Sequence, residues 1–595
     1  MVERGQHVKI SKTTITNFRG IKSACLVFPD HSILVGDNNV GKTTILEAID
    51  LAMGPDRLNR FPAIDEHDFY RGNYLKLQGE DEKQPEIRVE VILSDLSIEH
   101  RTRFGDYVEW WDKSTGSLYT EPNPEGVDDA SITACIRITF VGFYDEEEDD
   151  FQAQTYYGRT LDESTTPKVF GKKDKQICGF LYLRTLRTGS RAISLERGSL
   201  LDIILRLQDT RPQMWENTLS HLANFDVAGD PETGVTNILK TLNKAIKKYM
   251  PKEWGEQPHL KITNLTREQL RKVVTSFVST SDGHSAPFYR QGTGTINMLV
   301  LALLSQIAVE KQNVIFAMEE PEIAVPPYAQ KRIVDELRLL SAQSIFTSHS
   351  PYVLEEFEIE ETLVLARDNG GNLTQSKVNL PNSVKLKRYR QEFRTRFCEG
   401  LLARRILVVE GATEASAIPA AARRLAELSP DKYSSVEALG ICVIDAGSDS
   451  SIAPISNMYK ALNKETYGLC DKQGDEQRTK IESSVIKLFE HEEKGFEMLV
   501  LNNTNEQALK SFSDKIEWPQ SILDKGAAPE NDLKDAIFTY FKDAKGVGLI
   551  ADYLASCSEA DIPEWIRNTC IDLKELCSNS PPTPPVAEDT EVSFM

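Results

Sequence analysis

A glycine-rich segment near the N-terminus constrains the fold of this chain more than any other feature. Residues 36–43 read Gly-Asp-Asn-Asn-Val-Gly-Lys-Thr, between the apolar run 33–35 and the helix-like segment 44–49. A strand, a glycine loop and a helix in this order form a phosphate-binding loop, in which backbone N–H groups hold phosphate oxygens, the lysine reaches the outer phosphates and the hydroxyl binds Mg²⁺. The residues expected to hold the nucleotide are Gly36, Asn38, Asn39, Gly41, Lys42, Thr43 and Thr44, with Thr43 also a metal ligand.

Length and composition indicate a multidomain globular protein. The chain has 595 residues, too many for one core, so roughly two to four domains are expected. Hydrophobic residues make up 40% and charged residues 27%, an ordinary globular composition. No apolar stretch is long enough to span a bilayer, no secretory signal is present, and the nine cysteines include no C-x-x-C pair. We therefore expect a reduced, cytoplasmic protein without a membrane partner.

The net charge restricts how the chain can bind nucleic acid. At −21, the chain is a poor general binder of polyanions. Contact with DNA then needs a local basic stripe, or metal ions held by carboxylates. One basic run lies between Lys385 and Arg405, and a solvated helix face is its alternative interpretation.

Two further apolar runs end in residues suited to nucleotide hydrolysis. The run before Glu319 and Glu320 reads as a buried strand, and ligands sit at the carboxyl ends of parallel strands. Glu319 would hold the water shell of Mg²⁺, and Glu320 would orient or deprotonate the attacking water. The next apolar run ends at His349, where an imidazole could contact the γ-phosphate. A strand that ends in a solvated acidic turn is the alternative for the glutamate pair.

A second small-residue turn precedes an apolar helix. Gly292, Thr293 and Gly294 lead into the helical segment 298–309, and the N-terminus of a helix is an anion site. A single nucleotide already has its phosphate loop. The simplest functional interpretation is that this turn caps the γ-phosphate of a partner subunit, so we expect a homodimer or a higher homo-oligomer. An ordinary glycine turn is the alternative.

Helical periodicity between residues 199 and 250 interrupts a strand-rich region and suggests an insertion. A dimerisation arm and an ordinary helical layer are both open uses for it. The expected division of the chain is an N-terminal ATPase part at 1–185, a helical insertion or dimerisation region at 186–285, a C-terminal ATPase part at 286–375, a second α/β domain at 395–577 and a disordered tail at 578–595.

A second set of acids follows apolar runs in the C-terminal third. Three such runs end at Glu410, Asp445 and Asp471, and Glu414 lies one helical turn beyond Glu410. Carboxylate-tipped strands in an alternating α/β segment indicate a divalent-metal site, and hard oxygen ligands favour Mg²⁺ or Mn²⁺ over zinc. The natural chemistry of such a site is phosphodiester cleavage, in which metals activate water and stabilise the leaving oxygen.

These motifs together carry a family resemblance. Asn-Phe-Arg-Gly at 17–20, the phosphate loop, the Gly-Thr-Gly turn, Glu-Glu-Pro-Glu and Thr-Ser-His-Ser-Pro resemble an ABC-type ATPase of the RecF/SMC-like group. The segment around Glu410 resembles a Toprim domain. This order, from residue 8 to about residue 570, resembles the OLD (overcoming lysogenization defect) family of ATP-dependent endonucleases. The implied fold class is α/β, an ABC-type ATPase with a helical dimerisation insertion followed by a Rossmann-like Toprim domain.

The resemblance also implies roles for individual residues. Glu410 and Glu414 would be metal ligands, and Asp471 would be the first acid of an Asp-x-Asp motif. One departure concerns the second acid of that motif, because position 473 is Gln473; Asp475 and Glu476 are candidates to replace it. The expected catalytic residues are Glu320, His349, Glu410, Asp471 and Lys545, the last to stabilise the pentavalent phosphate. The expected metal ligands are Thr43, Glu319, Glu410, Glu414, Asp445, Asp471 and Glu497.

The function implied by the resemblance is a DNA endonuclease that uses ATP and Mg²⁺ or Mn²⁺, whose ATPase gates the nuclease. A role in bacterial antiphage defence and a partner protein or nucleic acid are part of the same expectation. One alternative is an ATP-dependent sensor or scaffold with a non-cleaving or partner-activated Toprim domain, which the glutamine at position 473 and the acidic net charge favour. Another is a strand-passage or primase enzyme, but neither a tyrosine-nucleophile domain nor a primase zinc domain is identifiable.

Overall fold

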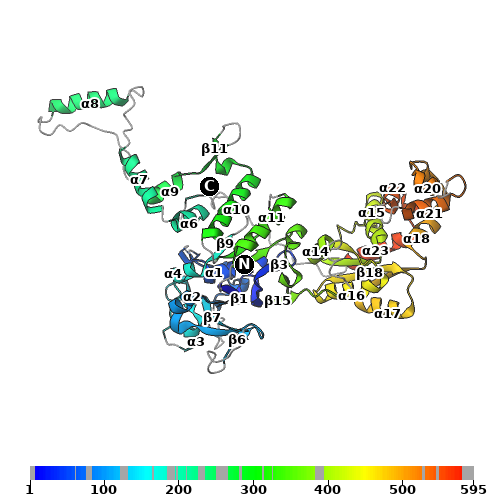
Figure 1. Ribbon diagram of the computed structural model, residues 1–595, viewed down its shortest axis with the longest axis horizontal. Helices are drawn as coiled ribbons and strands as arrows, with labels where there is room; N and C mark the ends of the chain where they lie inside the picture. The colour runs from blue at the N-terminus through cyan, green and yellow to red at the C-terminus, as the bar shows by residue number, and fades with distance from the viewer. Residues whose placement is uncertain are drawn as a thin grey trace.

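Two α/β lobes make up the molecule (Figure 1). In this computed structural model, the N-terminal lobe extends to residue 381 and the C-terminal lobe begins at residue 394. No helix in the described part of the chain is both long and apolar enough to cross a membrane. The structure describes residues 7–55, 57–59, 62–75, 84–120, 131–163, 166–183, 194–195, 199–208, 211–224, 235–249, 266–279, 285–310, 314–323, 326–381, 394–524, 529–543 and 549–578.

A mixed sheet of 13 strands forms the centre of the N-terminal lobe. Its order is β6-β5-β7-β4-β1-β2-β15-β14-β3-β13-β12-β9, and β8 pairs with β7. The strands are β1 (Lys9–Phe18), β2 (Ile21–Val27), β3 (His31–Val35), β4 (Glu86–Ser94), β5 (Glu109–Asp112), β6 (Ser117–Leu118), β7 (Ile132–Asp145), β8 (Asp150–Tyr157), β9 (Phe180–Leu183), β12 (Ile315–Glu319), β13 (Gln343–Thr347), β14 (Thr362–Arg367) and β15 (Asn372–Lys377).

Five neighbouring strands of this sheet run parallel and bring the motifs together. β9, β12, β13, β3 and β14 pair in parallel, and the register sets Glu319 opposite Thr347 and Thr347 opposite Leu34. Every residue of β12 and β13 is buried, as expected for parallel strands covered on both sides. The phosphate loop, the glutamate pair and the histidine therefore leave the sheet at the same edge.

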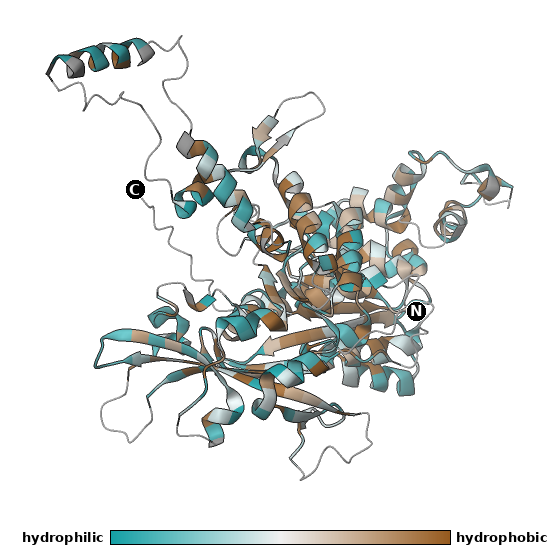
Figure 2. Ribbon diagram, turned by 60° about the vertical axis from the view of Figure 1, so that its left-hand side comes forward, coloured by the Kyte–Doolittle hydropathy of each residue, from teal (hydrophilic) through white to brown (hydrophobic). Residues whose placement is uncertain are grey.

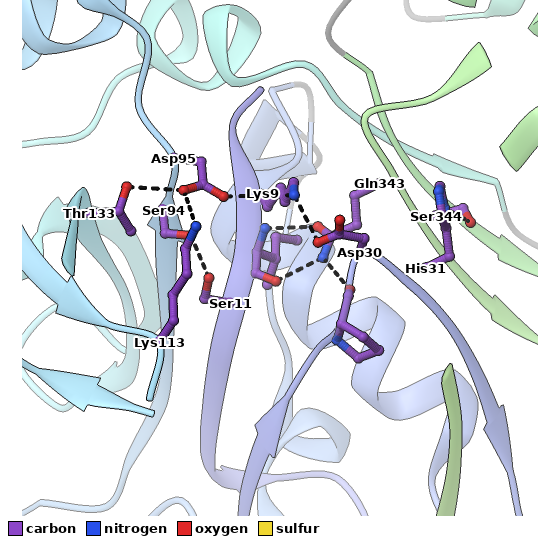
Figure 3. Close-up of polar contacts among 12 residues, drawn as sticks. Lys9, Ser11, Asp30, His31, Ser94, Asp95, Lys113, Thr133, Gln343 and Ser344 are labelled. Carbon is purple, nitrogen blue, oxygen red and sulfur yellow. Dashed lines mark hydrogen bonds and ion pairs between the residues drawn. The ribbon is translucent and has the colours of Figure 1, made fainter. Parts of the chain in front are cut away.

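The antiparallel strands are attached to the parallel ones through a buried side chain. Gln343 is fully buried, accepts a hydrogen bond from Ile10 N at 2.8 Å, and donates to Ile10 O at 2.9 Å and to Pro29 O at 3.1 Å (Figure 3). The register of β1 against β4 shifts between Ile10 and Lys12, and the Gln343 amide bonds both polar groups of Ile10 beside that irregularity. β1 lies between β4 and β2 and is paired on both sides.

Helices cover both faces of the N-terminal sheet. α1, which follows the phosphate loop, packs with the antiparallel strands in one apolar core, and α6, α10 and α11 pack on the opposite face in another. Arg19, in the turn between β1 and β2, forms ion pairs with Glu47 of α1 and with Asp68. The helices are α1 (Lys42–Met53), α2 (Ile98–Phe104), α3 (Gly158–Glu163), α4 (Lys172–Cys178), α6 (Leu200–Leu207), α7 (Arg211–Asn224), α8 (Val235–Tyr249), α9 (Arg267–Val273), α10 (Thr293–Glu310), α11 (Pro327–Leu340) and α12 (Pro351–Leu354). A hairpin of β10 (Phe277–Ser279) and β11 (Ser285–Pro287) precedes α10.

The C-terminal lobe is built on a parallel four-stranded sheet of order β17-β16-β18-β19. Its central strand β16 is buried at every residue. One face packs with α15, α22 and α23. The strands are β16 (Arg405–Val409), β17 (Ile441–Asp445), β18 (Glu465–Asp471) and β19 (Lys487–His491); the helices are α14 (Arg394–Leu402), α15 (Ala412–Leu428), α16 (Asp449–Ala461), α17 (Asp475–Ser484), α18 (Phe496–Asn502), α19 (Glu506–Ser513), α20 (Gln520–Leu523), α21 (Leu533–Asp543), α22 (Leu549–Ser556) and α23 (Glu564–Ser578).

One apolar core runs through both lobes. Phe346 and Phe357 of the N-terminal lobe belong to the same buried cluster as Phe397 of α14 and Tyr459 of α16. Gly400 of α14 lies so close to Tyr459 that an added Cβ would come within 2.5 Å of the phenol oxygen. This close packing lies within the C-terminal lobe, and the shared cluster joins α14 and α16 to the N-terminal lobe.

Candidate functional site

The phosphate loop has the backbone expected of an anion cradle. Gly41 lies directly before α1 with φ of 118°, and Asn39 also has a positive φ of 67°. An added Cβ at Gly36 would come within 2.7 Å of Leu365 O, so glycine is required by the neighbouring strand β14. Asn38, Asn39 and Thr43 are exposed at the loop, while Thr44 is half-buried. The predicted strand, loop and helix are all present.

The Lys42 side chain folds back onto the phosphate loop. Its ammonium group donates to Gly36 O at 2.7 Å and to Asp37 O at 3.1 Å, and its side chain is buried. Burial lowers the pKa of Lys42 to about 8, against the opposing effects of Asp37 and Glu320. The two carbonyl oxygens carry only partial negative charges. A bound phosphate group would give the Lys42 ammonium group a full negative charge as its partner.

The glutamate pair stands at the end of the strand beside β13. Glu319 is the last residue of β12, is buried, and accepts a hydrogen bond from the Tyr182 hydroxyl. Glu320 has a positive φ of 45°, and its N–H donates to Thr347 O at 2.9 Å. Such a conformation is costly for a glutamate, and a side chain held there by its neighbours is typical of a functional turn.

His349 lies at the same edge, two residues beyond β13. The surrounding chain desolvates its imidazole and, together with the charge of Lys42, lowers its pKa, while Glu320 opposes the shift. Glu322 holds the turn in place, since its carboxylate accepts hydrogen bonds from His349 N at 2.7 Å and from the Ser348 hydroxyl at 2.8 Å. Burial raises the pKa of Glu322.

The small-residue turn stands at the start of α10. Gly292 precedes the helix, and Thr293 and Gly294 form its first residues. Within the residues that the structure describes, no hydrogen bond or ion pair joins Gly292 to the phosphate loop. The turn therefore stays a predicted cap for the nucleotide of another subunit.

Acidic side chains converge at the carboxyl edge of the C-terminal sheet. Glu410 follows β16, Asp445 ends β17 and Asp471 ends β18, so the three expected strands are confirmed. The parallel register places Val409 opposite both Asp445 and Leu469. Gly411 then turns the chain into α15.

Glu414 and Glu410 belong to a cluster of closely spaced carboxylates. Glu414 is buried, and its Oε2 accepts a hydrogen bond from Gly411 N at 3.1 Å. Burial and the nearby charges of Asp471, Glu410 and Glu497 raise the pKa of Glu414 to about 7. Burial and the charges of Asp471 and Asp449 likewise raise the pKa of Glu410. A divalent cation would relieve this repulsion.

Asp471 is held by the strand and helix that follow it. Its Oδ2 accepts a hydrogen bond from Gly495 N at 2.7 Å, in the turn before α18 where Glu497 lies. Its Oδ1 is buried, lies 3.0 Å from His491 Nε2, and has no hydrogen bond of good geometry. His491 and Gly495 therefore lie against the two carboxylate oxygens of Asp471.

Gln473 occupies the place where the Asp-x-Asp pattern calls for a second acid. Its Nε2 donates to Asp471 O at 3.0 Å and makes a longer contact of 3.4 Å with Glu410 Oε2. Its backbone N–H donates to Glu490 at 2.7 Å. Asp475 and Glu476 are the candidates to replace the missing second acid. In the described structure neither forms a hydrogen bond or ion pair with the acidic cluster, since Glu476 pairs with Lys480 and Asp475 is exposed.

The carboxylate oxygens of the acidic cluster suit Mg²⁺ or Mn²⁺, but these side chains do not surround one point. Among the described residues, no group of three His, Cys, Asp or Glu side chains is positioned to hold a metal ion. Asp445 Oδ1 instead accepts a hydrogen bond from Gly447 N at 2.7 Å. Lys545 lies outside the described residues, as do residues 579–595 of the tail predicted at 578–595, whose first residue, Ser578, instead ends α23.

Sequence reasoning missed several residues that shape the two sites. His491 could have been found, because it ends β19 as the acids end the neighbouring strands. Asp449, at the start of α16, carried no motif. Of the basic run, residues 382–393 lie outside the described part, while Arg396 and Arg405 form ion pairs with Glu399 and Glu465.

Comparison with known proteins assigns a domain to each lobe. Residues 9–133 and 198–354 match the family described as AAA ATPase domain. Residues 401–472, which include Glu410 and Asp471, match the TOPRIM domain described as overcoming lysogenization defect protein-like. The Old nuclease of Escherichia phage P2 is 22% identical over 497 residues, which cover 78% of this chain and 77% of the relative.

Solved structures resemble the two lobes separately. The SMC head domain from Thermotoga maritima matches 62% of this chain and 100% of its own, with 12% identity and a TM-score of 0.27. The C-terminal region of the Burkholderia pseudomallei OLD protein matches 29% of this chain and 98% of its own, with 18% identity and a TM-score of 0.23. Both scores are too low to establish a shared fold.

Proposed function

We propose that this OLD-like protein, in which an AAA ATPase domain precedes an OLD-like TOPRIM domain, is a DNA endonuclease controlled by ATP. These two domains, together with a nuclease relative, make the chain an enzyme. The observation that carries the proposal is the cluster of Glu410, Glu414 and Asp471, whose burial and mutual repulsion a divalent cation would offset.

At the nucleotide site, the residues at the carboxyl ends of the parallel strands would have different roles in ATP binding and hydrolysis. Lys42 and the N-terminus of α1 would hold the phosphates, with Thr43 and Glu319 directed to Mg²⁺. Glu320 would accept a hydrogen bond from the attacking water, because it directly follows β12, which pairs with β13, and β13 pairs with β3, the strand before the phosphate loop. His349, with its lowered pKa, would stay neutral near pH 7 and contact the γ-phosphate.

At the acidic cluster, Glu410, Asp471 and Glu414 would hold Mg²⁺ or Mn²⁺, with Asp445 and Glu497 as further expected ligands. The bound cation supplies activation of water and stabilisation of the leaving oxygen. His491 and Gly495 keep Asp471 in place, and the Gly411 N–H does the same for Glu414. Lys545 would stabilise the developing phosphate charge.

The test is cleavage of supercoiled and linear DNA with Mg²⁺ or Mn²⁺, with and without ATP. Glu410→Ala is expected to reduce cutting by about 100-fold or more while ATP hydrolysis continues. Glu427→Ala, at an exposed position of α15, serves as the control and should cut normally. Lys42→Ala should remove ATP hydrolysis, and cutting that no longer responds to ATP would support gating; cutting identical to wild type with ATP would exclude it.

One observation favours a second function, an ATP-dependent sensor or scaffold whose TOPRIM domain does not cut. The amide of Gln473 stands where a second acid is expected, and it contacts Glu410. No DNA cleavage under any of these conditions, together with normal ATP hydrolysis, would favour this function. A co-purifying protein or nucleic acid that restores cutting would instead indicate partner activation.

The helical region at 186–285 is proposed to serve in dimerisation. Ile238 and Leu242 of α8 are exposed, and Figure 2 shows hydrophobic residues interleaved with hydrophilic ones along this helix. Replacement of both by glutamate should reduce the molar mass measured by light scattering to that of a monomer. An unchanged mass would exclude this helix as the contact.

Antiphage defence is proposed from the family resemblance. Cells that express the protein should lower phage plating efficiency, and Glu410→Ala and Lys42→Ala should each abolish that protection. Equal plating on all strains would contradict the role.

A further inference from the structure

A lysine of the C-terminal lobe reaches the phosphate loop of the N-terminal lobe. Lys464 Nζ lies 3.7 Å from Asp37 Oδ1, and Asp37 is the second residue of the loop. Asp37 also contributes the carbonyl to which Lys42 donates. Two ammonium groups, one from each lobe, therefore converge on one short loop.

The backbone before β18 directs this lysine. Asn463 has a positive φ of 60°, and the N–H of Lys464 donates to Tyr459 O at 3.1 Å, which together end α16 and turn the chain. Asparagine tolerates this left-handed conformation better than most residues. Lys464 thus leaves the helix at a defined angle, in the close-packed region where Tyr459 joins the core of both lobes.

The ion pair with Asp37 is too weak to account for the burial of Lys464. The Lys464 side chain is 6% exposed, whereas that of Asp37 is 56% exposed, and their separation exceeds that of a charged hydrogen bond. A buried ammonium group is costly unless a well-placed counter-charge accompanies it. Burial lowers the pKa of Lys464, and the charge of Lys464 contributes to the lowering of the pKa of Lys42. The two lysines therefore form a positively charged region without a well-placed negative partner, and a bound polyanion would supply one.

We propose that Lys464 of the TOPRIM domain is a ligand of the nucleotide phosphates bound at the phosphate loop. The phosphates would then replace the Asp37 carboxylate as the partner of Lys464. This assignment rests on the proposed nucleotide binding and deepens it, because the nucleotide then touches both lobes of one chain. Lys464 immediately precedes β18, and the same strand ends at Asp471 in the acidic cluster. One strand of seven residues, roughly 23 Å long, joins the two sites.

The experiment is titration of the full-length protein with fluorescent ATP and, separately, with fluorescent adenosine. Lys464→Met keeps the length of the side chain and removes its charge, and it should weaken ATP binding roughly ten- to hundredfold. Adenosine binding should stay unchanged, because adenosine carries no phosphate. Lys487→Met is the matched control, since Lys487 is exposed at the same end of the neighbouring strand β19. It should bind ATP as wild type does.

A second variant separates phosphate binding from a purely structural role. Asp37→Asn removes the carboxylate that competes for Lys464, so it should tighten ATP binding several-fold. A lysine that only anchors the lobes through Asp37 would predict no gain in ATP affinity for Asp37→Asn. Thermal unfolding without nucleotide checks that each variant is folded, and Lys464→Gln, which also removes the charge, replaces Lys464→Met if the latter is not.

The outcomes distinguish this inference from the proposed function. ATP affinity of Lys464→Met within twofold of wild type would overturn the role of Lys464 and leave nucleotide binding intact. Equal weakening of ATP and adenosine would also overturn it, because a phosphate ligand cannot act on adenosine. A wild-type protein that binds no ATP would overturn both.

Discussion

The carboxylate of Glu322 accepts a hydrogen bond from the backbone N–H of His349 over 2.7 Å. The same oxygen accepts one from the Ser348 hydroxyl, so a single side chain holds the turn that carries the histidine. Glu322 follows the glutamate pair in sequence, and it links the turns after β12 and β13 at the nucleotide edge of the sheet.

Loss of that carboxylate should impair ATP hydrolysis more than ATP binding. Glu322→Ala frees the His349 turn, and we expect kcat to fall about tenfold to 100-fold with KM changed little, because a misplaced contact acts mainly in the transition state. Steady-state ATPase assays measure both constants. Glu360→Ala, at an exposed position of the 3-10 helix η10 (Ile359–Glu361), is the control. A kcat equal to that of wild type would show that the turn holds without Glu322.

Conversion of Gln473 to aspartate should strengthen divalent-cation binding. The substitution replaces an amide that contacts Glu410 by a third carboxylate next to Glu410 and Asp471. Without metal, the added repulsion should lower Tm, and Mn²⁺ should restore it more strongly than in wild type. Calorimetry gives the affinity and thermal unfolding gives Tm. Gln507→Asp adds the same charge on α19, away from this cluster, and should change neither.

The raised pKa of Glu414 predicts a pH-dependent stability of the metal-free protein. Its folded-state pKa of about 7 exceeds the ordinary 4.5, so the folded state retains a proton that the unfolded chain releases. The resulting stabilisation is complete below about pH 4.5 and is lost as pH rises through about 7. With a chelator present, Tm should therefore fall between about pH 5 and about pH 8, and Glu414→Gln should flatten that fall.

Divalent cation should reverse this dependence. A cation favours the charged carboxylate, so Mn²⁺ should stabilise the protein more at about pH 8 than at about pH 6 and should release protons on binding near pH 7. Calorimetry in two buffers of different ionisation enthalpy counts those protons. Equal proton release by wild type and Glu414→Gln would show that another group titrates.

Replacement of Gln343 should destabilise the N-terminal lobe. Gln343→Leu leaves the N–H and carbonyl of Ile10 and the carbonyl of Pro29 without their buried partner, at a cost of about 2–4 kcal/mol. Gln375→Leu is a matched control, because Gln375 bonds both polar groups of Val27 in the same way at an exposed position where water replaces it. Denaturant unfolding compares the two. Equal losses would show that burial of Gln343 is not what matters.

Local patterns predicted the strand ends well. Each apolar run that ends in an acid or in His349 became a parallel strand, and parallel strands expose their carboxyl ends on one edge. The same rule, applied to the run before His491, would have added that residue. No local pattern, however, shows that β1 pairs on both sides, with β4 and with β2.

The sequence by itself determined which residues form the phosphate loop and the acid-tipped strands, because turn chemistry and hydrophobic period are local properties of the chain. Only the tertiary structure decided which distant side chains meet. Lys464 lies more than 400 positions after Asp37, and no local pattern marks it; the packing of α14 and α16 against the N-terminal lobe brings the two together. Such a contact depends on the sum of many apolar burials across the lobe boundary, which no short segment encodes.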